Sequence, residues 1–330
     1  MSHQSDQKGH LRIWPYGYQL ERNTFFGIRR LWSDSDSGMH DSAIVSFTWQ
    51  HMLRRFLLSG ILVLPLCVRA QDILKINGST TVNLPVAEAA EILRSERGMS
   101  IQLDTQGGSS GGISMLGDGL VQIGMSSKPV GDEDRAKYRK VAFSATQIGE
   151  DAVAMVVSRD VWESGVHALT KEEIAGIYEG RITNWREVGG SDRRVVFFNK
   201  EPGRGTWEVF VHWLYGNAEK APHVSFPEVG GNEETRNKVA STRGAISQLS
   251  SSWADGQTVF VLGIKTEGGM VTEATPANIA ARTYPVSRPL FLLTNGPPQG
   301  SANVFVDFML GERGQALVGK HGYLSLDQLK

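Results

Sequence analysis

The sequence has 330 residues, of which 40% are hydrophobic, and this is enough for a substantial core and one or two domains. Its 34 lysines and arginines balance 35 aspartates and glutamates, so the charge gives no support for a nucleic-acid partner. The only cysteine is Cys67, which excludes a disulfide framework and a cysteine-based metal site.

A basic and then apolar segment lies near the start of the chain. Arg54 and Arg55 precede the thirteen mostly apolar residues 56–68, and small side chains precede Gln71. Thirteen residues are too few for the roughly 20 that span a bilayer as a helix. The segment therefore predicts a signal peptide over residues 52–70, cleaved after Ala70, and a periplasmic protein.

The residues before this segment show no sustained helical or strand periodicity. A signal peptide belongs at a chain start, so the simplest interpretation is that translation begins at Met52. Residues 1–51 are then a gene-model artefact or a disordered extension. The alternative is a true cytoplasmic extension, with residues 56–68 acting as a signal anchor.

From Gln71 onward, the sequence alternates between strand and helix patterns. Thr170 and Glu173 form a capping box, which predicts a helix start. This alternation is typical of an α/β fold with a largely parallel sheet. The expected strands are 73–77, 101–105, 121–125, 152–157, 195–199 and 288–293, and the expected helices are 82–93, 113–120, one after Thr170, 207–214 and one near the C-terminus that Ser301 could cap.

Three turns rich in Gly, Ser and Thr each follow an expected strand and precede an expected helix. They are residues 78–81, 107–112 and 203–206. Ligands of open α/β sheets bind at this edge, where helix starts offer unpaired N–H donors and partial positive charge. Three converging turns would surround a small oxyanion, although each turn could also be an ordinary helix cap.

The second turn also matches G-x-S-x-G, the motif that presents a catalytic serine in α/β-hydrolases. A catalytic serine needs a histidine base, and none of the four histidines after residue 71 lies in a suitable arrangement. A serine hydrolase therefore remains a remote alternative, testable by ester hydrolysis in a Ser109→Ala variant. From the sequence we therefore expect that the protein is not an enzyme.

Three other site types, a P-loop, a metal site and a nucleic-acid site, lack their sequence patterns. Residues 314–321 fit G-x-x-x-x-G-K without the following Ser or Thr and without a preceding strand, so they are not a P-loop. No His, Asp or Glu cluster has metal-ligand spacing, and no basic stripe accompanies the aromatic residues. We therefore expect no metal, no cofactor and no nucleic acid.

Six motifs in order resemble one known family. They are INGSTTVNLP, TQGGSSGGI, VQIGMSSKPV, IAGIYEGRITNWREVGG, GRGTWEVF and YPVSRPLFLLTN. Together they resemble the phosphate-binding proteins of bacterial phosphate ABC importers, over essentially all of residues 71–330. The resemblance implies a monomer with the two-lobed class II periplasmic binding fold, in which each lobe is a mostly parallel sheet flanked by helices. Two crossing strands would join lobe one, residues 71–149 and 286–330, to lobe two, residues 150–285.

The resemblance also implies the function and the ligand-binding residues. The protein would capture inorganic phosphate by lobe closure and deliver it to the permease of an ABC importer. By position, Thr80 and Thr81 match donors of the first turn, Ser109 matches the serine of the second, and Gly205 and Thr206 match donors of the third. The alternatives are a protein for sulfate, molybdate or arsenate, or a phosphate sensor or adhesion protein of the same fold; a neighbouring transporter gene would separate transport from sensing.

Three positions differ from the best-known branch of that family. Ser127 stands where that branch has Asp, Lys200 where it has Arg, and Arg204 where it has Ser. Without the Asp, the site would offer donors and cations only, unless another acid reaches it. Lys200 and Arg204 are close enough for both to face one anion; alternatively, Arg204 points to solvent or pairs with an acid such as Glu208.

Overall fold

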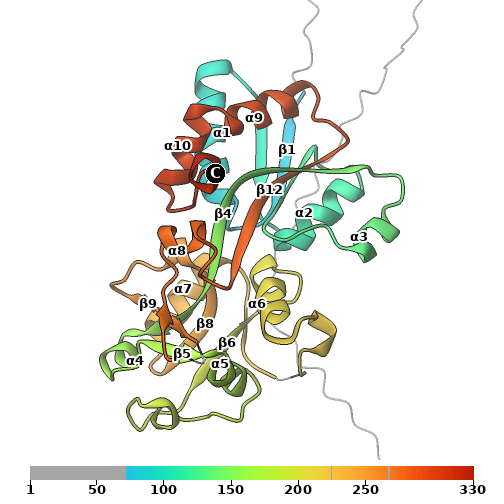
Figure 1. Ribbon diagram of the computed structural model, residues 1–330. Coiled ribbons are helices and arrows are strands. Elements are labelled where there is room, and N and C mark those ends of the chain that lie inside the picture. Colours follow the sequence, from blue (N-terminus) through green and yellow to red (C-terminus); the bar gives the residue numbers. More distant parts are fainter. Residues whose placement is uncertain (1–71, 224, 267) are drawn as a thin grey trace, which may run out of the picture. The chain divides into compact units, whose positions relative to one another are not determined.

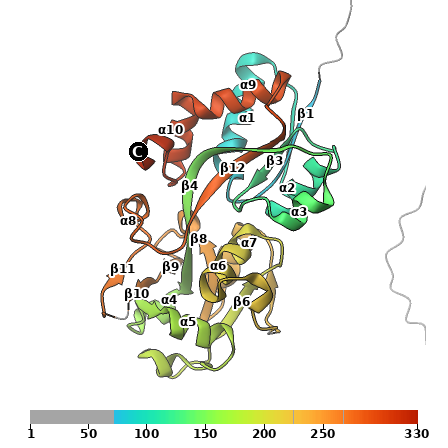
Figure 2. The same cartoon turned by 45° about the vertical axis from the view of Figure 1, so that its right-hand side comes forward.

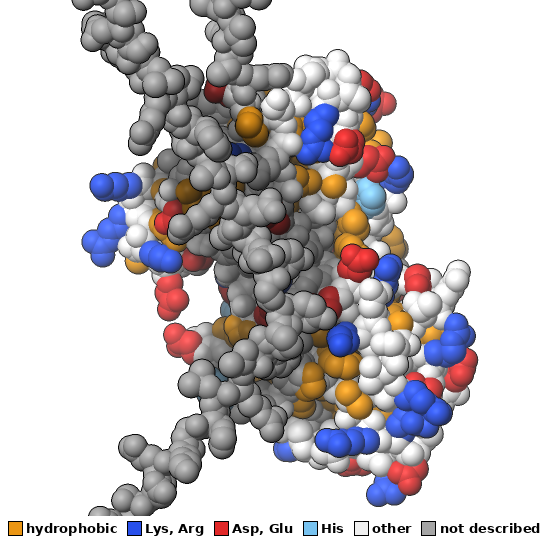
Figure 3. Space-filling model, turned by 180° about the vertical axis from the view of Figure 1, so that it is seen from behind, with side chains coloured by type: hydrophobic (Ala, Val, Ile, Leu, Met, Phe, Trp, Pro, Cys, Tyr) orange, Lys and Arg blue, Asp and Glu red, His pale blue; other side chains and the backbone are white. Residues whose placement is uncertain are grey.

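The computed structural model describes residues 72–223, 225–266 and 268–330, and these belong to one compact unit. The predicted signal peptide, 52–70, and the preceding residues 1–51 lie outside the described residues. Within the described part of the chain, none of the helices has the length and apolar character needed to cross a membrane. Figure 3 shows acidic and basic side chains intermixed over the part of one face that is described.

The first lobe begins with three parallel strands, in the order β2 (Ile101–Asp104), β1 (Leu74–Gly78) and β3 (Ile123–Ser126). These strands confirm the predicted strands within two residues. The accompanying helices are α1 (Asn83–Arg97), α2 (Gly108–Gly117) and α3 (Asp132–Lys137). The predicted start of α2 at residue 113 was wrong: the helix begins inside the glycine-rich turn, which places Ser109 in its first turn.

Two antiparallel strands join the lobes. The strands β4 (Phe143–Ser158) and β12 (Ser287–Asn295) pair along most of their length and run between the two groups of helices (Figures 1 and 2). The predicted strand 152–157 covered only part of β4, because the preceding half of β4 lacks the continuous apolar run. The sheet is therefore mixed, with parallel strands at its two ends.

The second lobe continues the sheet with β8 (Ala245–Ser250), β6 (Val196–Lys200) and β7 (Glu228–Val229), which are parallel to one another. A small sheet is formed by β5 (Ala168–Thr170), β10 (Gly263–Lys265) and β11 (Val271–Thr272), while β9 (Val259–Val261) pairs with β4. The helices are α4 (Arg159–Glu163), α5 (Lys171–Tyr178), α6 (Gly205–Tyr215), α7 (Asn232–Ser241) and α8 (Pro276–Ala280), with short 3₁₀ helices at Trp185–Val188, Ala218–Lys220 and Ser251–Trp253.

The capping prediction for α5 is confirmed, since the Thr170 hydroxyl accepts a bond from the Glu173 N–H and the Glu173 carboxylate accepts one from the Thr170 N–H. The chain ends with α9 (Gly300–Leu310), α10 (Glu312–Lys320) and a 3₁₀ helix at Leu326–Leu329, which return to the first lobe. The cap predicted at Ser301 was wrong: Gln299 is the N-cap residue, and its side chain makes no capping hydrogen bond.

Each lobe has its own buried apolar cluster. In the first, residues of β1 and α1 such as Leu74, Val86 and Leu93 pack with Phe305 and Val306 of α9. In the second, the buried aromatic residues Tyr178, Trp185, Phe197 and Phe210 pack with aliphatic side chains of β4 and α5. The two clusters share no residue, and the crossing strand β4 contributes to both, with Ile148 in the first and Ala152 in the second.

Candidate functional site

The three turns expected from the sequence lie around one small polar pocket. Residues 79–81 follow β1, residues 108 and 109 begin α2, and residues 204–206 begin α6. The first two turns belong to the first lobe and the third belongs to the second. The turns come together because each follows the carboxyl end of a parallel strand, as the sequence pattern predicted.

Backbone donors at two helix starts are free to bind a ligand. Within the described residues, the N–H groups of Ser109, Gly205 and Thr206 have no hydrogen-bond acceptor. No side chain caps α2 or α6, so these N–H groups and the positive ends of both helix dipoles remain available to an anion.

Three buried serines form one wall of the pocket. The Ser79 hydroxyl donates to Ser127 Oγ at 3.0 Å, and the Ser127 N–H donates to Ser109 Oγ at 3.1 Å. The hydroxyls of Ser109 and Ser127 are 3.3 Å apart. Ser127 thus lies beside Ser109 in the wall of the pocket. Ser109 has no histidine partner among the described residues, so it lacks the base that a hydrolase serine needs.

Lys200 reaches the pocket but directs its donors at the protein. Its Nζ donates to the carbonyls of Gly230 and Gly231 and to Asn232 Oδ1, each at 3.1 Å. An ammonium has three donors, so all are engaged. Burial, together with the positive charges of Arg204 and Arg288, holds the pKa of the Lys200 ammonium well below its usual range. From the sequence we expected Lys200 and Arg204 both to face one anion; in the structure, the Lys200 donors bond residues 230–232 instead.

The residues that Lys200 contacts form a fourth turn, which the sequence analysis missed. Gly230 and Gly231 lie between β7 and α7, and Gly230 and Asn232 line the pocket. Asn232 Nδ2 also donates to Thr81 Oγ1, a bond of 2.9 Å between the two lobes. The sequence EVGGNEET repeats the strand, glycine turn and helix pattern of the other three turns, but two-residue β7 is too short to be recognised by periodicity.

Arg204 lies at the pocket as part of an ion pair. Its guanidinium donates to Glu201 at 2.7 and 3.0 Å. Glu208, the acid considered as its partner from the sequence, instead pairs with Lys128 of the first lobe. Arg204 is therefore held against the pocket wall by an acid outside the pocket, rather than pointing to solvent.

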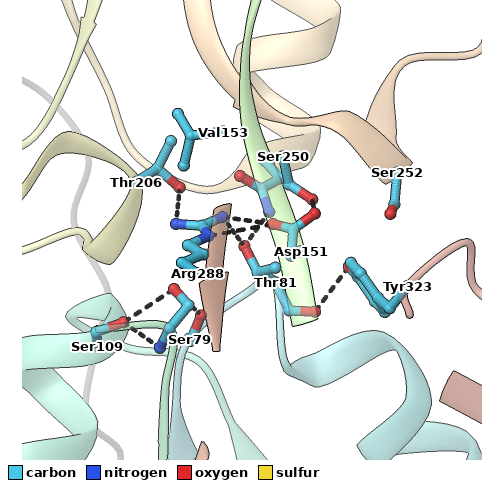
Figure 4. A network of polar contacts seen from close by, with 12 residues as sticks. Ser79, Thr81, Ser109, Asp151, Val153, Thr206, Ser250, Ser252, Arg288 and Tyr323 are labelled. Atoms are coloured by element: carbon cyan, nitrogen blue, oxygen red, sulfur yellow. Dashed lines mark hydrogen bonds and ion pairs between the residues drawn. The ribbon is translucent and has the colours of Figure 1, made fainter. Parts of the chain in front are cut away.

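Arg288 is a buried arginine that the sequence analysis missed. Arg288 of β12 is 1% exposed and lies opposite Asp151 of β4, with Nη2 and Nε 2.8 and 3.1 Å from Asp151 Oδ2. It also donates to Thr206 Oγ1 and Thr81 Oγ1, one threonine from each lobe (Figure 4). Burial raises the pKa of the Asp151 carboxyl, and Arg288 opposes that rise. The signal was present in YPVSRPL, where an arginine interrupts an otherwise apolar strand.

The chemistry of the pocket is that of an anion receptor. Its lining within the described residues includes hydroxyls, backbone N–H groups and cationic side chains, but no Asp or Glu. The part of the chain that the structure describes also contains no group of three or more His, Cys, Asp or Glu side chains that could hold a metal ion. A buried set of fixed donors favours a small ligand whose surface consists of acceptor oxygens.

Comparison with known proteins gives consistent relatives. A PBP superfamily domain model matches residues 68–313. A Bacillus subtilis (strain 168) protein named phosphate-binding protein PstS is 31% identical over 264 residues, which cover 79% of this chain and 83% of the relative. The phosphate-binding protein PstS of Borreliella burgdorferi is 28% identical, with 78% of this chain and 91% of the relative covered.

Solved structures show the same similarity. A Clostridium perfringens protein, described as a phosphate ABC transporter substrate-binding protein with bound phosphate, is 29% identical with a TM-score of 0.68, covering 77% of this chain and all of that one. An ABC-type phosphate transport receptor from Vibrio cholerae is 25% identical with a TM-score of 0.61, covering 76% and 99%. With its two-lobed fold and anion pocket, the chain therefore belongs to the PBP superfamily and, within it, to the family of phosphate-binding proteins of phosphate ABC transporters.

Proposed function

We propose that this protein captures inorganic phosphate between its two lobes and delivers it to an ABC importer. The observation that carries the proposal is the pocket itself, where turns from both lobes present donors and cations and no carboxylate. The names of the relatives and the phosphate bound in the Clostridium perfringens structure support the same ligand and partner. The ligand-binding set is Thr80, Thr81, Ser109, Ser127, Arg204, Gly205 and Thr206, with Lys200 acting through the fourth turn.

The mechanism is closure of the lobes around a desolvated anion. We assign residues 71–149 and 286–330 to lobe one and 150–285 to lobe two, with β4 and β12 as the hinge. The Ser110 N–H donates to the Gly203 carbonyl across the lobes at 3.1 Å, and the Lys128–Glu208 ion pair joins them at the pocket edge. Opening about the hinge would break these contacts and expose the anion to water, whereas closure strengthens each charge-assisted hydrogen bond.

The direct test is native mass spectrometry of the purified protein, followed by calorimetric titration of the anion-free protein with phosphate. We expect one phosphate per chain. A protein that binds no phosphate under either measurement would contradict the proposal. An arsenate, molybdate or sulfate mass would favour the second candidate, another oxyanion; the absence of a carboxylate among the described lining residues gives that candidate its support.

We also propose that the protein is exported to the periplasm. The basic and apolar segment 52–70 has the composition of a signal peptide, so the mature chain should begin at Gln71. N-terminal sequencing of material from the periplasmic fraction measures this directly. A mature product that still contains residues 1–51 would contradict both the processing site and the start at Met52.

Removing one threonine hydroxyl should weaken binding strongly. The Thr206→Val change removes a buried hydroxyl that accepts from Arg288 at 3.0 Å and lines the pocket. The loss of a hydrogen bond to a charged ligand costs about 1.5–3 kcal/mol, which is roughly a ten- to hundredfold loss of affinity. Calorimetry with phosphate measures the change. The control is Thr283→Val, which removes an exposed hydroxyl outside the pocket; equal affinity in both variants would remove Thr206 from the site.

A further inference from the structure

We propose that Arg288, held by Asp151, is a positioning residue that fixes the hydroxyls of Thr81 and Thr206 as hydrogen-bond donors to the ligand. As a consequence, the ligand oxygen that faces Thr81, whose hydroxyl has no free lone pair, is favoured in its unprotonated form. The inference rests on the proposed function, because it assigns the protonation state that the bound oxyanion must have at this part of the pocket.

The first step is the fixed position of the guanidinium. Arg288 is 1% exposed, and the carboxylate of its cross-strand neighbour Asp151 accepts two of its N–H groups. The other oxygen of Asp151 accepts the Ser250 hydroxyl at 2.9 Å, which holds the carboxylate in turn. A planar guanidinium fixed at one edge presents its remaining N–H groups in one direction.

The second step is the effect on the threonines. Thr81 Oγ1 accepts from Arg288 Nη2 at 3.1 Å and from Asn232 Nδ2 at 2.9 Å, and Thr206 Oγ1 accepts from Arg288 Nη1 at 3.0 Å. A hydroxyl has one proton and two acceptor lone pairs, so both lone pairs of Thr81 are occupied. Neither threonine O–H has an acceptor among the described residues, and both residues line the pocket (Figure 4).

The third step concerns the ligand. Because both lone pairs of Thr81 Oγ1 are occupied, this hydroxyl can donate to a ligand oxygen but cannot accept a ligand proton. A P–OH proton directed at Thr81 would therefore meet the hydroxyl proton, whereas Thr206 keeps one free lone pair. The pocket should therefore favour the phosphate dianion over the monoanion. Sulfate is a suitable reference because it carries no proton over the same pH range. Protonation of the protein would change the affinity for both anions, whereas protonation of the ligand changes only the affinity for phosphate.

The experiment is a double-mutant cycle measured by calorimetry. Removing Arg288 alone would leave Asp151 buried and unpaired, so the background is the paired variant Asp151→Asn with Arg288→Met, checked for folding by circular dichroism and thermal unfolding. In the native protein, Thr206→Val should lower phosphate affinity on the order of tenfold or more; in the paired background it should lower affinity by less than roughly threefold, because an unheld hydroxyl has no fixed direction. Equal losses in both backgrounds would overturn the inference.

A second readout separates positioning from a merely structural role. The ratio of phosphate affinity at pH 8 to that at pH 5.5, normalised to sulfate, should be large in the native protein and at least about threefold smaller in the paired variant. An unchanged ratio in the folded variant would overturn the inference and leave phosphate binding itself intact. Native protein that binds neither anion would instead refute the proposed function. The matched control is the paired variant Glu150→Gln with Arg282→Met, since Arg282 pairs with Glu150 of β4 but is 65% exposed and contacts neither threonine.

Discussion

A single methyl group at position 205 is expected to abolish tight anion binding. An alanine Cβ at Gly205 would lie 2.6 Å from Ser109 Oγ and from Ser127 Oγ, and 3.2 Å from the Ser127 carbonyl carbon. These serines belong to the lobe opposite α6, so the methyl group would hold the lobes apart. We expect Gly205→Ala to lower phosphate affinity by at least about a hundredfold, equivalent to about 2.7 kcal/mol.

Although Gly205→Ala should lower the affinity for phosphate, it should not lower the stability of the anion-free protein. Alanine has a higher helix propensity than glycine, and residue 205 lies in the first turn of α6. Calorimetry gives the affinity and thermal unfolding gives the stability. The control is Gly319→Ala in α10, where a Cβ meets nothing within 4 Å. If Gly205→Ala binds phosphate as tightly as this control, the lobes do not close on one another at this turn.

A carboxylate at position 127 should exclude sulfate. Ser127 is 1% exposed and is surrounded by the hydroxyls of Ser79 and Ser109, so Asp at this position would face the ligand without solvent. A carboxylate opposite a protonless oxyanion places two acceptors together with no hydrogen between them, which costs several kcal/mol in a buried site. We expect Ser127→Asp to lower sulfate affinity more than about a hundredfold, while phosphate, which can carry a proton there, binds better at acid pH.

Calorimetric titrations with both anions at acid and mildly alkaline pH provide the measurement. The Ser127→Asn variant is the control, because it has nearly the size of Asp and no charge. We expect the native protein and the Asn variant to discriminate weakly between the two anions, whereas the Asp variant discriminates strongly. A native protein that ignores sulfate, combined with an Asp variant that behaves as the native protein does, would show that position 127 does not face the anion.

The local features of this protein could be predicted from its sequence because they depend on neighbouring residues. The alternation of strand and helix patterns indicates the α/β fold, and the Thr170–Glu173 capping box places the start of α5. The glycine-rich turns at residues 78–81, 107–112 and 203–206 also follow from local pattern, since only the edge of a parallel sheet can bring them together. That edge is where the pocket lies.

The partners of the buried charged side chains could be identified only from the tertiary structure. Lys200 precedes the predicted turn 203–206 and Arg204 lies within it, yet the Lys200 donors bond the Gly230–Asn232 turn, about 30 residues away. Arg288 reaches Thr81 across 207 residues and Thr206 across 82. Local periodicity reports which face of an element is buried, but the partner of a buried charge depends on which strands become neighbours. Here the antiparallel pairing of β4 with β12 places Arg288 opposite Asp151, behind the pocket, and no pattern within either segment contains that contact.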